Sequence, residues 1–276
     1  MTGSAVLPRA RVDPGTALAL AVLAFAVFAA AFPGVVSSHA PNAISAASLQ
    51  GPSWQHLFGT DQTGRDEFSR VIHGARASLL IGFGAMLVGL VVGVVIGGLA
   101  ATGPRWLRRP LDRLTELLFS FPGMVLAVVL IAALGPSPVT LALAVGIGNS
   151  PGYARIVRAQ VIEVTASEYA LSQLQLGHSR RYVAATTIAG NVTRPLVPLA
   201  TLGVGQAIIW ASALSFLGLG AQPPTAEWGL MLSNARSLIS QAWWLTFFPG
   251  AAIAVVSITL TALGHSVQRA LLAGTR

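Results

Sequence analysis

Long apolar stretches separated by short polar segments recur along almost the whole chain. Each is close to 20 residues long and carries almost no charge, which matches one helical crossing of a bilayer. Helices satisfy their backbone polar groups within lipid, whereas a soluble core would show amphipathic periodicity instead. We therefore predict an all-α fold, a polytopic transmembrane helical bundle with six spans. The predicted spans are 16–36, 78–101, 114–134, 139–156, 196–217 and 245–267.

The charges between these runs predict the orientation of the bundle. All 17 basic residues are arginine, and the formal net charge is +8. In the six-span scheme Arg65, Arg70, Arg76 and Arg236 lie in outer segments and the other arginines in inner ones, as the positive-inside rule requires. This places both termini in the cytoplasm. The arginines alternate with apolar runs instead of forming one basic face, so nucleic-acid binding is disfavoured.

The first apolar run follows Arg9 and Arg11, and small residues suited to signal-peptide cleavage come after it. It is longer than the usual hydrophobic region of a signal peptide. We expect an uncleaved first span, with cleavage as the alternative.

Small residues recur every fourth position in the second run, at Ala85, Gly89, Gly93, Gly97 and Ala101. This spacing predicts a smooth stripe against which another helix packs closely. The alternative is that the stripe acts as a hinge or gate, and both roles can hold together. In the fourth run, Pro151 predicts a kink or an early end of the helix.

Candidate catalytic chemistry is sparse. The five histidines are scattered, cysteine and lysine are absent, and the acidic residues fall almost wholly in loops or at span ends. A proton-relay carboxylate in mid-membrane is therefore missing, which disfavours the main alternative, a secondary transporter. The phosphate-binding P-loop needs a lysine, so ATP, if it drives the function, binds to another chain. We expect no enzyme activity, catalytic residue, metal or cofactor in this chain.

The polar segment 162–195 is the longest predicted inner loop and contains the sequence "ASEYALSQLQLGHSRR". Thr165 or Ser167 is suited to cap a short helix there, and Gly177 is suited to end it. A helix of about ten residues is too short to be stable alone. We expect it to dock on a soluble partner, with packing on lipid or on the chain itself as the alternative.

This segment resembles the cytoplasmic loop of binding-protein-dependent ABC importer permeases, whose coupling helix inserts into a groove on the ATPase. The family pattern is Glu-Ala-Ala, three residues, Gly, about nine residues, then Ile-Leu-Pro. Gly177, Ile188 and the following Asn191 match, while Leu171, Ser172 and Gln173 replace Glu-Ala-Ala and Ala189-Gly190 replaces Leu-Pro. The resemblance implies that the ATPase-docking residues are Glu168, Tyr169, Leu171, Ser172, Gln173, Leu174 and Gly177.

Two further stretches, "FGTDQTGRDEFSRVIHGARASLLIG" and "ALSFLGLGAQPPTAEWGLML", resemble the dipeptide and oligopeptide permease subfamily, as do "QAWW" and "FPGAAI". The resemblance is to the second of its two paired permease chains. It implies a homologous permease partner, two ATPase subunits that hold ATP and Mg, and an extracytoplasmic solute-binding protein. It also implies a prokaryotic cytoplasmic membrane and short peptides as substrates, with haem or nickel as alternatives.

The same resemblance divides the chain into residues 1–76, with a cytoplasmic tail, the first span and an outer loop, and a five-span permease core, residues 77–276. In the outer loop, Gly64 is suited to a positive φ, and Arg65 and Arg70 are placed to pair with nearby acids. We expect this loop to tie the first two spans together, with binding-protein contact as the alternative.

The expected outer rim or docking residues are Asp61, Arg65, Gln222, Pro223, Glu227 and Trp228. For Trp228, Trp243 and Trp244 we favour a role as interfacial anchors over substrate contact.

Overall fold

The computed structural model describes residues 13–183, 186 and 189–273, and their regular structure is helical apart from one isolated bridge between Thr60 and Asp66. The helices are α1 Pro14–Ala31, α2 Pro33–Val36, α3 Glu67–Thr102, α4 Arg105–Ser120, α5 Gly123–Leu134, α6 Pro138–Thr165, α7 Glu168–Gln175, α8 Arg180–Val183, α9 Ala189–Phe216, α10 Trp228–Ala235 and α11 Trp244–Ala273.

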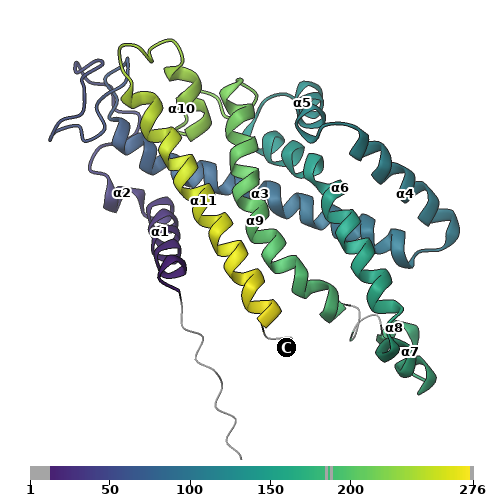
Figure 1. Cartoon of the computed structure of the whole chain (residues 1–276). Coiled ribbons are helices and arrows are strands. Elements are labelled where there is room, and N and C mark those ends of the chain that lie inside the picture. Colours follow the sequence, from purple (N-terminus) through teal and green to yellow (C-terminus); the bar gives the residue numbers. More distant parts are fainter. Residues whose placement is uncertain (1–12, 184–185, 187–188, 274–276) are drawn as a thin grey trace, which may run out of the picture.

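The long helices form one bundle with α3 at its centre (Figure 1). Helix α3 packs against α6, α9 and α1, and α9 packs against α11. Successive long helices run alternately toward and away from the end that carries α10, while α7 and α8 lie at the opposite end (Figure 1). We call the α10 end outer and the α7 end inner.

Length and composition mark α1, α3, α9 and α11 as helices able to cross a membrane, and the bent pair α4 and α5 as a possible fifth span. Helix α6 has 28 residues, which is long enough, but its second half carries Arg155, Arg158 and Glu163. The arrangement is compatible with six spans, and that number stays a prediction. The all-helical transmembrane fold itself is confirmed.

The structure changes two of the predicted spans. The third is not one helix, because α4 ends at Ser120, α5 begins at Gly123, and the two axes differ by 97°. Phe121 and Pro122 are extended between them. In the fourth, α6 passes through Pro151 and ends at Thr165, so an early end at the proline is wrong. Proline has no backbone N–H, so the helix lacks one hydrogen bond at Pro151. Ser150 and Ala154, on either side of it, are buried, and this packing compensates for the lost hydrogen bond.

The glycine stripe of α3 lies directly against α6. A Cβ atom added at Gly89 would be 2.8 Å from the Gly146 carbonyl oxygen, and one at Gly93 would be 3.0 Å from the Ala154 nitrogen. One at Gly97 would be 3.0 Å from the Val157 Cβ atom. Only glycine allows the two backbones to approach this closely, so the predicted close helix contact is confirmed.

Candidate functional site

Helix α7 at the inner end forms as the sequence predicts. The Ser167 hydroxyl oxygen accepts a hydrogen bond from the Ala170 amide at 3.3 Å and so caps the first turn. At the other end Gly177 takes a φ of +89°, which a residue with a side chain rarely adopts. The helix therefore has a defined start and a defined stop within the inner segment.

The surface of α7 is largely unpartnered. Tyr169 is 63% exposed and Leu176 75% exposed, Leu171 is also exposed, and Ala170 is the buried residue of the helix. Among the described residues the main packing partners of α7 are α8 and α6. A helix of eight residues is marginal alone, and exposed aromatic and aliphatic side chains at a helix surface are typical of a protein-docking site.

Other residues expected to dock also lie on or near α7. Glu168 and Ser172 are exposed, and Gln173 and Leu174 are half-buried. Ile188, which matched the family pattern, lies outside the described residues. The docking role of this helix stays a prediction.

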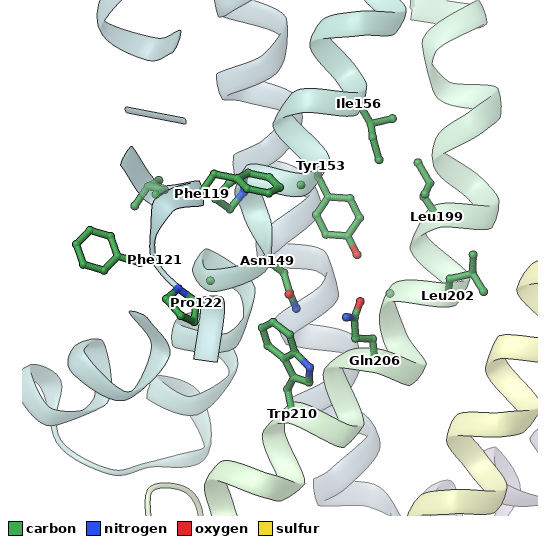
Figure 2. Close-up of a pocket in the computed structure, with 16 residues that line it drawn as sticks. Phe119, Phe121, Pro122, Asn149, Tyr153, Ile156, Leu199, Leu202, Gln206 and Trp210 are labelled. Carbon is green, nitrogen blue, oxygen red and sulfur yellow. The ribbon is translucent and has the colours of Figure 1, made fainter. Parts of the chain in front are cut away.

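A cleft of about 590 Å³ opens between the α4 and α5 bend, the middle of α6 and the middle of α9. Figure 2 shows Asn149, Tyr153, Gln206 and Trp210 turned toward the same space between α6 and α9. Its apolar wall comes mainly from the bend and from α9. The residues at the bend are Leu118, Phe119, Phe121, Pro122 and Gly123.

The polar side chains of the cleft have no partners of their own. None of the four has a hydrogen-bond partner among the residues that the structure describes, and none of the residues lining the cleft is charged. Unpaired amide, hydroxyl and indole groups at membrane depth are costly unless they face water or a ligand. The cleft is therefore suited to hold water and a passing polar molecule without a fixed charge.

Glycines shape the walls of this cleft. A side chain at Gly203 would collide with the Tyr153 hydroxyl, so the glycine lets that group reach α9. A Cβ atom at Gly123 would be 2.9 Å from both the Gly148 carbonyl oxygen and the Trp210 ring. The start of α5 is thus pressed against α6 and α9, which fixes the bend as one wall.

A second cleft, of about 630 Å³, continues the first toward the inner end. The two share Ile156, Leu199 and Leu202, and the second is also lined by Arg194 and Gln268 near the inner ends of α9 and α11. Together the two clefts extend from the middle of the bundle toward the inner ends of α9 and α11. These clefts were not predicted from the sequence, although Asn149 and Gln206 within apolar runs were an available signal.

The outer loop is held by a cluster of charges around Asp61. Its carboxylate accepts hydrogen bonds from the Thr63 amide and hydroxyl, each at 2.7 Å, and from Arg65 Nε at 2.6 Å. Burial alone would raise the pKa of Asp61, but these hydrogen bonds hold it below its ordinary value of 3.8. Gly64 takes the predicted positive φ of +76° and lies against the Ser45 carbonyl oxygen. The expected pairing of Arg65 with Asp61 is confirmed.

The start of α3 is fixed to the same loop. Asp66 caps the helix by accepting from the Ser69 amide at 2.8 Å, and His56 Nδ1 lies 2.8 Å from its other oxygen. Arg70 donates to the Pro41 carbonyl oxygen and to Asn42, and its Nε lies 3.9 Å from Asp61. This supports the prediction that the loop ties the first two spans together.

Two residues expected on the docking rim are buried instead. Glu227 is 2% exposed and caps α10 by accepting from the Gly229 and Leu230 amides at 2.8 Å each. Trp228, also 2% exposed, donates to the Val71 carbonyl oxygen at 2.9 Å. The expected docking role of these two residues is therefore corrected, because both lie inside the bundle.

The interfacial-anchor role expected for Trp228 and Trp244 is wrong for the same reason. Trp244 is buried and donates to the Thr60 carbonyl oxygen, whereas Trp243 is exposed. Gln222 and Pro223 are exposed on the outer turn, and their docking role stays a prediction.

A family described as "Binding-protein-dependent transport system inner membrane component" matches residues 68–276 of the chain. Among individual proteins, the dipeptide transport system permease protein DppC of Alkalihalophilus pseudofirmus is 38% identical over 250 residues, which are 91% of this chain and 82% of that protein. The glutathione transport system permease protein GsiD of Pectobacterium atrosepticum is 36% identical over 222 residues, 80% of this chain and 74% of that protein.

The fold is also similar to a solved structure, an inward-facing conformation of the MetNI methionine ABC transporter. The TM-score is 0.60 at 17% identity, and the match covers 76% of this chain and 98% of that chain.

Proposed function

Because the chain belongs to the family of binding-protein-dependent transport system inner membrane components, we propose that its clefts form half of a pathway for short peptides. The chain is a multi-pass membrane permease subunit of an ABC importer, and ATP hydrolysis belongs to a separate ATPase subunit. The chain is therefore not an enzyme.

The observation that carries the peptide proposal is the group of four uncharged polar side chains that face the first cleft from the middle of α6 and α9. Amide side chains such as Asn149 and Gln206 both donate and accept, as the peptide main chain does. The lining of the first cleft carries no charge and so fixes neither end of a peptide, whereas the second cleft, nearer the inner end, is lined by Arg194. The names of the similar proteins, which include dipeptide and glutathione permeases, support this substrate class.

The same lining argues against the alternative substrates and mechanism. It has no histidine, methionine or carboxylate to bind nickel or the iron of haem. It also has no ionisable relay of the kind that a proton-coupled secondary transporter needs.

The partners follow from the family in general terms: a partner permease, ATPase subunits and a solute-binding protein. The finer assembly is our proposal. It has one homologous permease, two ATPases docked on the inner end through α7, and the binding protein on the outer end. The concentration of arginine at the inner end supports a cytoplasmic location for both chain ends.

We derive the coupling step from the connection between α7 and α6. Only Ala166 and Ser167 separate the two helices, so a displacement of α7 passes directly to α6. Helix α6 carries Asn149 and Tyr153, which line the cleft. ATP can drive this change only if it binds one state of the ATPases more tightly than the other.

The cleft is tested with Gln206→Leu, which replaces an amide by an apolar group of similar size. The matched control is Ile209→Leu, on the same helix but outside the cleft lining. Both variants are reconstituted with the complete complex in proteoliposomes, and uptake of a radiolabelled peptide is measured beside ATPase activity. We expect Gln206→Leu to lower uptake several-fold with ATPase activity retained. Uptake equal to that of the control would remove the cleft from the pathway.

The inner docking surface is tested by single-cysteine crosslinking, since the chain has no cysteine of its own. Ser172→Cys on α7 is compared with Ser237→Cys, an exposed position near the outer end. A short crosslinker is attached in the assembled complex, and the captured protein is identified by mass spectrometry. We expect the ATPase on Ser172→Cys only. Capture on neither position would return α7 to packing on lipid or on the chain itself.

A further inference from the structure

The second cleft differs from the first in the charge of its lining. Among the described residues that line it, Arg194 is the one that carries a charge, and Gln160 and Gln268 are the other polar ones. The three belong to α9, α6 and α11, and each lies five residues, or about 7.5 Å, from the inner end of its helix. The inner ends of these helices lie at a similar level (Figure 1), so the three side chains start from a similar depth.

None of these three side chains has a hydrogen-bond or ion-pair partner within the part of the chain that the structure describes. Arg269, beside Gln268 on α11, adds a second positive charge to this end of the bundle. No described acid lines the cleft or lies within ion-pair distance of Arg194, and this includes the four acids of the inner end, Asp112, Glu116, Glu163 and Glu168. The cleft therefore offers one positive charge and two amides, which suit an anionic group and not a cation.

An exposed arginine is satisfied by water, so the exposure of Arg194 alone does not indicate a ligand. What indicates one is that donors from three helices face a single cleft, and that this cleft continues into the proposed peptide pathway. Ile156, Leu199 and Leu202 line both clefts and lie deeper in the bundle than the three polar residues. An anionic group at the inner end with an apolar or neutral body toward the middle fits this order of side chains.

We propose that the second cleft is an exit subsite of the pathway, in which Arg194, with Gln160 and Gln268, receives the C-terminal carboxylate of the peptide. This inference rests on the proposed function. A guanidinium binds a carboxylate through two parallel N–H···O hydrogen bonds, and the two amides supply further donors. The same arginine repels the ammonium group at the other end, so the carboxyl end of the peptide leads toward the cytoplasm. A lipid phosphate shares this anionic chemistry, but the continuity of the two clefts favours the peptide.

The distance between the two clefts separates this subsite from the contacts in the middle of the bundle. Gln206 and Arg194 are twelve residues apart on α9, which is about 18 Å along the helix. An extended chain spans at most about 3.6 Å per residue, so a dipeptide or tripeptide reaches about 7–11 Å and cannot contact both. A short peptide therefore meets Arg194 only after it has left the level of Gln206. The first cleft does not distinguish the two ends of the peptide, and the second does.

The test is photolabelling of the complete transporter in lipid nanodiscs, where the inner side is open to solution and no solute-binding protein is needed. The probe is a tripeptide with p-benzoylphenylalanine as its first residue and either a free C-terminal carboxylate or an amide. With the carboxylate on Arg194, the photoreactive group lies level with Leu199 and Leu202, about 8–12 Å farther along α9. We expect the free acid to label this segment about three- to five-fold more than the amide, as for an exposed ion pair.

Arg194→Gln should lower labelling by the free acid to the level of the amide, whereas Arg194→Lys keeps the charge without the planar fork and should retain part of the difference. The matched control is Arg109→Gln, which removes an exposed arginine of the inner end that lines neither cleft, and it should leave the ratio unchanged. If Arg194→Gln does not assemble, the wild type carries the test. Moving the photoreactive residue from the first to the last position should then shift the label toward Arg194.

Equal labelling of the wild type by acid and amide, or an unchanged ratio in assembled Arg194→Gln, would overturn the proposal. Phosphatidylglycerol that copurifies with the wild type but not with Arg194→Gln, and that the free-acid peptide does not displace, would assign the site to a lipid phosphate instead. Peptide uptake into proteoliposomes is measured in parallel. A wild type that takes up neither form of the peptide would contradict the proposed function, whereas normal uptake with equal labelling would contradict the exit subsite alone.

Discussion

Replacing Glu227 by glutamine is expected to destabilise the outer half of the bundle and to leave the docking surface itself unchanged. The carboxylate accepts from the Gly229 and Leu230 amides and from the hydroxyls of Ser78, at 3.2 Å, and Ser215. The Ser78 hydroxyl is in turn the acceptor for the Trp228 amide at 3.1 Å. Glu227 therefore joins α3, α9 and the start of α10.

The magnitude follows from the donors that a glutamine cannot satisfy. Its carbonyl oxygen can replace one carboxylate oxygen, but its NH₂ group then faces an amide that also donates. One buried backbone N–H is left unsatisfied, at a cost of about 1–3 kcal/mol, and the remaining hydrogen bonds lose their charge assistance. We expect a total loss of about 2–4 kcal/mol. For a chain of this size that corresponds to a fall in Tm of about 5–10 °C.

The assay is thermal unfolding of the purified chain in detergent, followed by far-UV circular dichroism and by tryptophan fluorescence. Trp228 is buried beside the mutated residue and so reports the local change. Glu163→Gln removes the same charge from an exposed position and is expected to change stability by no more than about 0.5 kcal/mol.

One result would contradict this role of Glu227 as a buried helix cap. If Glu227→Gln melts at the same temperature as Glu163→Gln but no longer binds the solute-binding protein, the Glu227 carboxylate acts at a docking surface instead.

Three further predictions concern other parts of the chain. Gly93→Val places atoms against the Ala154 backbone and should destabilise the contact between α3 and α6 by about 3 kcal/mol. Gly98→Ala, which has open space at its Cβ atom, should not destabilise the chain, and thermal melting compares the two variants. Asp61 has a lowered pKa, so the stability it adds is fully present above pH 3.8 and is lost as the pH falls through its folded-state pKa. The stability difference between the wild type and Asp61→Asn should therefore shrink in acid titrations below about pH 4, and a difference that is constant with pH would contradict this. Gly177→Pro cannot adopt the φ of +89°, so the chain should insert but fail to couple ATP hydrolysis to peptide uptake, and normal uptake would count against the coupling role of α7.

The sequence predicts best those features that depend on local pattern. Apolar runs predicted the long helices, and the combination of Ser167 and Gly177 predicted both ends of α7. The bend between α4 and α5 was not predicted, because the run from 114 to 134 is mostly apolar and the break falls at Phe121 and Pro122.

Features that depend on distant partners were predicted least well. Glu227 and Trp228 follow a proline-rich turn, a context typical of an exposed loop. Their burial comes from Ser78 and Val71, about 150 residues earlier in the chain. The cleft combines α4, α5, α6 and α9, and no short stretch of sequence contains that combination.

The glycine contact between α3 and α6 has a mechanical consequence for the transport cycle. Because the backbones of α3 and α6 are in direct contact, we expect the two helices to tilt together as a rigid pair and not to slide past each other. Helix α3 has 36 residues and is about 54 Å long, so a tilt of about 5° around one end displaces the other by about 5 Å. Helix α3 begins at Glu67 beside the outer loop, and its partner α6 leads into α7 at the inner end. A displacement of α7 at the inner end is therefore expected to move the outer loop at the start of α3.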